Sequence, residues 1–112
     1  MLNSGDVIAV DLGTPAGREA GFHRRAVVVT AQPILDGLPS VVQIVPLTST
    51  IRKFASEVIL DPNNGSGLDV SSAAQCQHVR SVATQRLSIA MGNVGPVSLQ
   101  QMREVLAQIF DL

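Results

Sequence analysis

The sequence predicts a small, mainly β protein whose curled sheet, a barrel or a sandwich, is closed by one C-terminal α-helix. Three observations support this class. Short runs rich in Val and Ile recur along the chain, loops rich in Gly and Pro separate them, and apolar residues at helical spacing fill the last part. A chain of 112 residues has room for one core, so we expect one domain over residues 1–112.

Five apolar segments are predicted to be strands. The segment 25–30 contains three consecutive valines, which is typical of a strand buried on both faces. Pro46 in the third segment cannot donate a ladder hydrogen bond, which predicts a sheet edge or a bulge there. The five predicted strands cover residues 7–12, 25–30, 41–47, 57–60 and 73–82.

The predicted loops differ in length. Residues 13–22 hold three glycines and one proline, and a loop of this length in a compact domain is often functional. Pro33, Gly37 and Pro39 break the segment after the second strand. Residues 61–67 form a predicted turn of residue types that tolerate positive φ. A short turn or helix is expected at 84–87.

The C-terminal segment is predicted to be an amphipathic helix. Gly95 and Pro96 end whatever precedes, and Ser98 with Gln101 forms a capping box. Val97 and Met102 have the spacing of a hydrophobic staple. The residues that repeat at helical spacing, and are expected to face the barrel, are Leu99, Met102, Val105, Leu106 and Ile109.

The charge is balanced overall but uneven along the chain. The formal net charge is −1, with 46% hydrophobic and 15% charged residues. Arg18, Arg24 and Arg25 surround the first loop, and Arg52 and Lys53 follow the third strand. Folding could bring these two groups together as a local basic patch of the kind that binds nucleic acid, but charge alone favours a set of ordinary solvated side chains.

The sequence lacks the residues that several kinds of site require. The chain has one cysteine, Cys76, and two distant histidines, His23 and His78, so neither a disulfide nor a metal site is expected. We expect Cys76 to be a buried small hydrophobe. No phosphate-binding loop is present, so no cofactor is expected. Neither a signal peptide nor an apolar run long enough to span a membrane is found, which favours the cytoplasm.

Several segments, taken in order, resemble the MazF/PemK toxin family. The opening Gly5-Asp6-Val7-Ile8 resembles the start of the family's first strand. Residues 17–29 (GREAGFHRRAVVV) resemble its loop and following strand, and residues 45–50 (VPLTST) its strand ending in threonine. Residues 77–82 (QHVRSV) and 85–87 (QRL) resemble its late strand and turn. The resemblance runs from residue 5 to residue 112.

This resemblance implies a homodimeric SH3-like barrel that acts as the toxin of a toxin–antitoxin system. The implied activity is metal-independent, sequence-selective cleavage of single-stranded RNA (mRNA, tRNA or rRNA) by attack of the 2′-hydroxyl on the adjacent phosphate. A cognate antitoxin protein would inhibit it. Arg24 matches the family's catalytic arginine and Thr48 its catalytic threonine. Two departures are Arg25, where proline is usual, and His78, where glutamine is frequent.

The chemistry of these residues suits RNA cleavage. An arginine is a poor base but an excellent clamp for phosphate oxygens, so Arg24 is expected chiefly to stabilise charge, with a role in proton donation left open. Histidines titrate near neutrality and could supply acid or base help, although His23 should point away from Arg24 by strand alternation. Phe22 and Phe54 could stack on bases or pack in the core. The expected substrate-binding residues are His23, Arg25, Ser49, Thr50, Arg52, Lys53, Gln77 and His78.

Two rival functions fit the same sequence. The chain could be a non-catalytic toxin of the same fold that binds DNA gyrase, in which case its activity would lie in the C-terminal helix. It could also be a plain SH3-like interaction module. Growth arrest on expression would separate the toxins from the module, and RNA degradation in EDTA would separate the nuclease from the gyrase binder.

Overall fold

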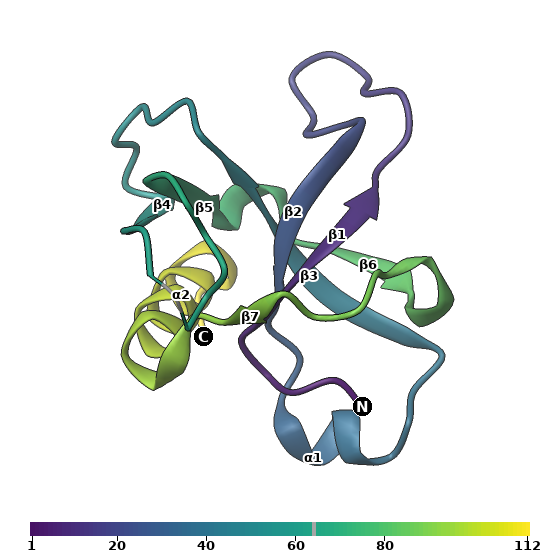
Figure 1. Ribbon diagram of the computed structural model, residues 1–112. Coiled ribbons are helices and arrows are strands. Elements are labelled where there is room, and N and C mark those ends of the chain that lie inside the picture. Colours follow the sequence, from purple (N-terminus) through teal and green to yellow (C-terminus); the bar gives the residue numbers. More distant parts are fainter. Residues whose placement is uncertain (64) are drawn as a thin grey trace.

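The computed structural model describes residues 1–63 and 65–112, and its centre is one antiparallel, strongly curled sheet (Figure 1). The strands run in the order β4-β5-β3-β2-β1-β7, and β6 pairs with another part of β3. Two α-helices, α1 (Gln32–Asp36) and α2 (Gly95–Phe110), and two 3₁₀ turns, at Cys76–His78 and at Thr84–Arg86, complete this part of the chain. The strands are β1 (Asp6–Asp11), β2 (His23–Val28), β3 (Val41–Thr48), β4 (Glu57–Leu60), β5 (Ser72–Gln75), β6 (Arg80–Ala83) and β7 (Gly92–Asn93).

Strand alternation sends neighbouring residues to opposite faces of the sheet and produces two apolar clusters. Val7, Val27 and Val45 face one way, and their cluster includes Met102 of α2. Ile8 and Ile44 face the other way, and their cluster is covered by the loop after β1 and by α1. The prediction of a mainly β fold with a C-terminal helix is therefore confirmed, and the predicted burial of Cys76 is too.

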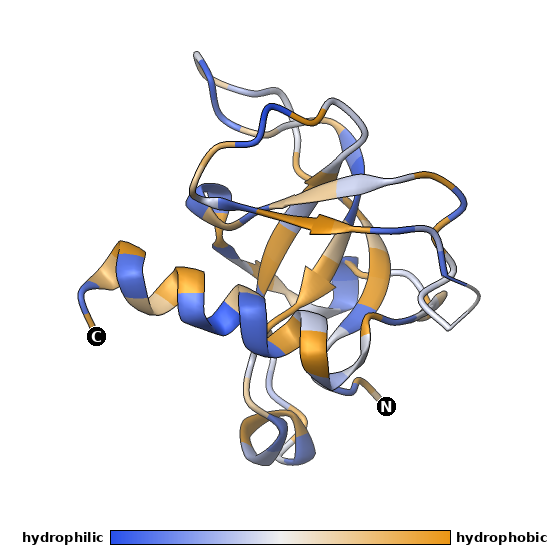
Figure 2. Cartoon of the chain, turned by 90° about the vertical axis from the view of Figure 1, so that its left-hand side faces the viewer, coloured by the Kyte–Doolittle hydropathy of each residue, from blue (hydrophilic) through white to orange (hydrophobic). Residues whose placement is uncertain are grey.

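Helix α2 packs on the sheet through its first half. Leu99 and Met102 are buried, Val105 and Leu106 are half-buried, and Ile109 is exposed. Figure 2 shows the last turns of the helix extending past the strands. The amphipathic spacing was therefore a correct signal for the helix, but its last apolar residues do not reach the core. No helix in the part of the chain that the structure describes has the length and apolarity needed to cross a membrane.

The predicted start of α2 is wrong. The helix begins at Gly95, three residues before the expected cap Ser98, and no side chain caps it at the N-cap position. Pro96 lies in the first turn of the helix, where a missing N–H costs nothing, and the preceding strand β7 ends before it, at Asn93, as expected. The Val97–Met102 staple does not form either, because Val97 is 72% exposed while Met102 is fully buried.

A buried clasp joins the N-terminus to the start of α2. Asp6 is buried; its Oδ2 accepts the amide of Asn3 at 2.7 Å, and its Oδ1 accepts Nδ2 of Asn93 at 3.0 Å. The Oδ1 of Asn93 in turn accepts the first helical N–H, that of Gly95, at 2.8 Å. Gly5 precedes this clasp with φ +92°, a conformation that favours glycine. The opening Gly-Asp pair therefore serves the fold.

Four other expectations need correction. The predicted strand 73–82 is two strands, β5 and β6, separated by a 3₁₀ turn at Cys76–His78, because they pair with different halves of β3. The second strand lies two residues earlier than predicted, and α1 occupies part of a predicted loop. Pro46 is not on an edge strand: it pairs with Ala26 on one side, and on the other side it lies in the gap between Ile44, where the pairs with β6 end, and Leu47, where the pairs with β5 begin.

The predicted turn at 61–67 forms, with a bridge from Asn63 to Leu68 and with Gly67 at φ +76°. Residue 64 of this turn lies outside the described residues.

Candidate active site

Arg24 and Thr48 lie at the same end of the sheet. The last pair between β2 and β3 at this end is Ala26 with Pro46. Arg24 lies two positions beyond Ala26 on β2, and Thr48 lies two positions beyond Pro46 on β3. Continuing the antiparallel register sets Arg24 level with Thr48. The loops after β1 and after β3 project from this end of the sheet (Figure 1). The order of the strands thus brings together residues that are distant in sequence.

The guanidinium of Arg24 is held by two hydrogen bonds. Its Nε donates to the carbonyl of Gly21 at 3.0 Å, and its Nη1 donates to Oε1 of Gln75 at 3.1 Å. The side chain is only half-buried. A guanidinium has five N–H donors in a rigid fork, so two of them fix its orientation while others remain for a ligand. Such a group is suited to binding phosphate oxygens.

Behind Arg24 lies a second layer of buried polar side chains. Gln75 and Glu57 are directly opposite each other on β5 and β4, and both are buried. The Oε1 of Glu57 accepts the amide of Arg52 at 3.1 Å, which ties the loop after β3 to the sheet. Its Oε2 is buried without a hydrogen-bond partner in the described part of the chain. One member of this opposed pair thus holds Arg24, and the other holds the loop after β3.

His78 lies on the same side as Arg24, at the end of the 3₁₀ turn after β5. Partial burial lowers the pKa of His78 below its usual value, the charge of Arg24 lowers it further, and Glu19 opposes both. His78 is thus favoured in the neutral form, in which one ring nitrogen can accept a proton. It lines a hollow of about 320 Å³ together with Glu19, Ala20, Gln77, Val79 and Arg80.

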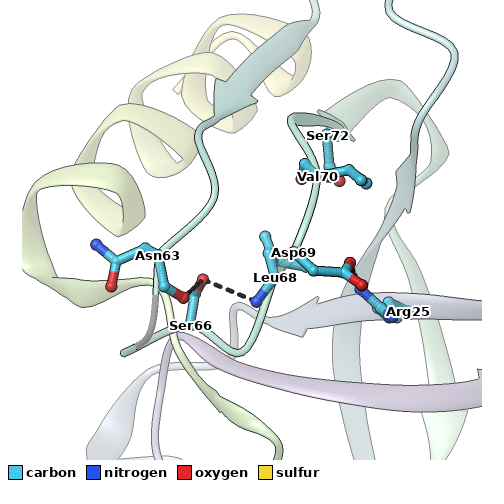
Figure 3. A network of polar contacts seen from close by, with 7 residues as sticks. All are labelled: Arg25, Asn63, Ser66, Leu68, Asp69, Val70 and Ser72. Carbon is cyan, nitrogen blue, oxygen red and sulfur yellow. Dashed lines mark hydrogen bonds and ion pairs between the residues drawn. The ribbon is translucent and has the colours of Figure 1, made fainter.

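Thr48 opens onto a different hollow, of about 260 Å³, which it shares with Ser49 and Arg25. In this hollow Nη1 of Arg25 contacts Oδ1 of Asp69 at 3.2 Å (Figure 3). The hydrogen bond from Arg25 lowers the pKa of the Asp69 carboxyl below its usual range. The hollow therefore carries a cation that is already paired with a carboxylate from the segment before β5.

The remaining predicted site residues are exposed to solvent. The amide of Thr50 donates to Oγ1 of Thr48 at 3.1 Å, so the strand end and the loop start are joined. Arg52 and Lys53 are exposed, and Lys53 has φ +58°. His23 is exposed and lies 3.6 Å from Asp11, while Arg24 turns inward to Gln75, as strand alternation predicts.

The structure adds four residues that the sequence analysis did not single out. Gln75, Glu57, Asp69 and Glu19 each contact or border a predicted site residue. Only the pairing of β4, β5 and β3 brings the first three near the site, so local sequence patterns carried no signal for them. Glu19 lies in the first loop, which was predicted to be functional. Within the described residues, no group of three or more His, Cys, Asp and Glu could hold a metal ion.

Two comparisons of the sequence identify relatives of this chain. The family model described as "PemK-like, MazF-like toxin of type II toxin-antitoxin system" matches residues 3–110. The chain is 36% identical to the endoribonuclease MazF9 of Mycobacterium tuberculosis, over all of this chain and 98% of that one.

Solved structures share the fold. MazF from Deinococcus radiodurans superposes with a TM-score of 0.83 at 23% identity, covering 99% of this chain and 97% of that one. An endoribonuclease from a mycobacterial species, in complex with its cognate antitoxin, superposes with a TM-score of 0.77 at 19% identity, covering 100% and 97%. Because the family model spans almost the whole chain, the protein belongs to the PemK/MazF family of type II toxin–antitoxin toxins.

Proposed function

We propose that this chain is a toxin that cleaves single-stranded RNA at selected sequences, using the RNA's own 2′-hydroxyl and no metal ion. The observation that carries the proposal is the guanidinium of Arg24, fixed by Gly21 and Gln75, with His78 close enough for its pKa to be lowered by Arg24 and with Thr48 level with Arg24 in the continued β2–β3 register. The 36% identical relative is an endoribonuclease, which supports the same activity.

The reaction needs a base for the 2′-hydroxyl, donors that stabilise charge on the phosphate oxygens, and a proton for the leaving group. The base removes the proton of the 2′-hydroxyl, the freed oxygen attacks the adjacent phosphorus, and the bond to the 5′-oxygen breaks as that oxygen takes up a proton from water. The products are a 2′,3′-cyclic phosphate and a 5′-hydroxyl. We assign the base role to His78, whose pKa is lowered by burial and by Arg24 so that the neutral ring is available.

Arg24 stabilises the negative charge that develops on the non-bridging oxygens, because its remaining N–H donors are oriented before the substrate arrives. Thr48 donates its hydroxyl to one of the same oxygens, and its Oγ1 is oriented by the amide of Thr50. Substrate contacts beyond the reacting phosphate fall to Arg25, Ser49 and Gln77, which line the two flanking hollows.

The proposed partners are a second copy of the chain and a cognate antitoxin. An apolar hollow of about 510 Å³ supports an interface with a second copy, because apolar surface of this kind is more stable when covered. Its lining includes Met1, Leu2, Leu35, Leu38 and Ile89. The mycobacterial structure with its cognate antitoxin supports the second partner.

One observation favours the rival gyrase-binding toxin. The last residues of α2 and the C-terminus leave apolar side chains exposed, with Phe110 58% and Leu112 94% accessible. A toxin that acts by binding a protein through its C-terminal helix needs such a surface. In that case the residues around Arg24 would be dispensable for growth arrest.

The test is cleavage of a long, weakly structured RNA in EDTA. Wild type should give discrete cuts, and Arg24→Ala should lose them at equal thermal stability. Arg103→Ala is the matched control, because Arg103 is also half-buried and hydrogen-bonded, to Ser4 Oγ at 2.7 Å, but lies on α2. No cutting by wild type, while its expression still stops growth, would contradict the nuclease and support the gyrase binder. Without growth arrest, the result would favour an interaction module.

A further inference from the structure

All three aromatic side chains of this protein lie on its surface. Phe22, Phe54 and Phe110 are 63%, 53% and 58% exposed, and the sequence has no Trp or Tyr. Aromatic rings usually contribute a large share of core burial, yet the buried apolar residues here are aliphatic apart from Cys76 and Met102. The prediction that Phe22 or Phe54 could pack in the core is therefore wrong. These rings are free to contact another molecule.

Phe22 also has a backbone conformation that favours glycine. Its φ is +60°, in the left-handed region where a Cβ atom crowds the backbone. In the same loop Gly13 and Gly17, with φ +76° and +59°, hold the other left-handed positions. A phenylalanine at such a position is unfavourable for the fold, and strain of this kind is concentrated at functional sites.

Two hydrogen bonds close the neck of the loop at Phe22. Its N–H donates to the carbonyl of Gly13 at 2.6 Å, and its carbonyl accepts the N–H of Leu12 at 2.9 Å. Gly21 packs so closely on Pro15 that a Cβ atom there would lie 2.5 Å from the proline ring. The strained conformation is therefore built into the loop and is not the result of a free chain end.

The backbone next to Phe22 is hydrogen-bonded to the proposed catalytic group. The carbonyl that accepts Nε of Arg24 belongs to Gly21, the residue before Phe22, so the guanidinium contacts the peptide unit that Phe22 begins. Phe54 lies on the loop after β3, next to the left-handed Lys53, and its carbonyl accepts the N–H of Glu57 at 3.0 Å. The two loops that border the site each present one exposed ring.

We propose that Phe22 is a base-stacking residue that receives the nucleobase beside the phosphate bound by Arg24. This inference rests on the proposed function and identifies a residue that determines which RNA positions are cut. A nucleobase is favoured over a protein segment because Arg24, two residues after Phe22, holds free guanidinium donors next to the ring-bearing loop, a setting suited to a flat, phosphate-linked ligand. Phe54 provides a second platform on the opposite loop.

Substitutions separate stacking from folding. Phe22→Leu keeps an apolar side chain and Phe22→Gly relieves the backbone strain, and both should lower kcat/KM for RNA about 5- to 100-fold, the usual value of one base stack. Phe22→Tyr should recover most of this loss. The Tm of Phe22→Gly should equal or exceed that of wild type, because glycine accepts φ +60° without strain. Phe110→Leu is the control for an exposed ring far from the site and should cut RNA as wild type does.

A direct readout uses the absence of tryptophan from the sequence. With Arg24 retained, Phe22→Trp introduces the sole tryptophan, and its fluorescence should fall when a single-stranded oligonucleotide binds whose 2′-hydroxyls are methylated and which therefore cannot be cut. Phe110→Trp should show no such change. Wild-type rates and an unchanged cutting pattern in Phe22→Leu would overturn the proposal, as would a change of oligomeric state that accounts for the loss. If wild type itself does not cut RNA, the proposed function fails. The stacking proposal fails as well if the fluorescence of the Phe22→Trp variant does not fall when the oligonucleotide is added.

Discussion

Gln75 offers the sharpest test of how the site is organised, because it contacts Arg24 and no part of the proposed substrate path. Its Oε1 accepts Nη1 of Arg24 at 3.1 Å, and its side chain is buried. Gln75→Leu removes this acceptor while keeping a similar volume. The guanidinium then keeps only its bond to Gly21 and can rotate about it.

The size of the effect follows from the bond that is lost. A hydrogen bond to a charged group contributes about 1.5–3 kcal/mol, and a loss of this size in the transition state lowers kcat about 10- to 150-fold. Because Arg24 is half-buried, water can replace the lost partner in the resting protein, so the free energy of unfolding should fall by only about 1 kcal/mol. KM should change little, since Gln75 does not line either hollow beside the site.

The assay is a double-mutant cycle with single-turnover RNA cleavage. If Gln75 acts through Arg24, then Gln75→Leu should have no further effect in the Arg24→Ala background. Gln75→Glu, which retains an acceptor, should recover much of the wild-type rate, and Gln85→Leu, at an exposed position, serves as control. Wild-type kcat in Gln75→Leu, or equal losses in both backgrounds, would refute the positioning role.

Two further predictions concern the titration of His78 and the buried clasp at Asp6. The NMR titration midpoint of His78 should lie below 6.5; Arg24→Ala should raise it, because a positive charge is removed, and Glu19→Gln should lower it. Because the pKa of His78 is lower in the folded chain, the unfolded chain binds more protons as pH falls through 6.5, and the contribution of His78 to stability should decrease there. A titration midpoint above 6.5 would contradict this prediction. Asp6→Ala removes two hydrogen bonds from a buried carboxylate and should cost about 3 kcal/mol, seen as a Tm fall of about 10 °C, with a fall below about 3 °C as the contradicting result.

The strands and the last helix could be predicted because their periods are local properties of the sequence. The runs of β-branched residues in β1 and β3 reflect burial on both faces of the sheet, and the helical spacing from Leu99 to Leu106 reflects burial on one face of α2. The break between β5 and β6 could not be predicted in this way. No Gly or Pro interrupts residues 73–82, and the break arises because β3 accepts the two halves at different positions.

The site was predictable only in part for the same reason. Arg24, Thr48 and His78 were identified through a resemblance that preserves their order in the chain. The partners that orient them are chosen by long-range pairing: Gln75 meets Arg24 from β5, and Glu57 faces Gln75 from β4. The role of such a residue depends on which strand lies beside it, and no local sequence pattern indicates this. In the sequence, Gln75 and Glu57 are therefore indistinguishable from ordinary strand residues.

The arginine in place of the family's usual proline gains a physical interpretation from strand alternation. Arg24 and Arg25 are consecutive on β2, so they point to opposite faces, and the structure pairs one with Gln75 and the other with Asp69. The two cations therefore cannot clamp one phosphate together without disrupting the strand. Thr48 is level with Arg24 in the continued register and also lines the hollow that contains Arg25, so it lies between the surroundings of the two arginines. An RNA bound as proposed would have to compete with Asp69 for Arg25, so we expect this position to select the neighbouring nucleotide rather than to act as a second catalytic charge.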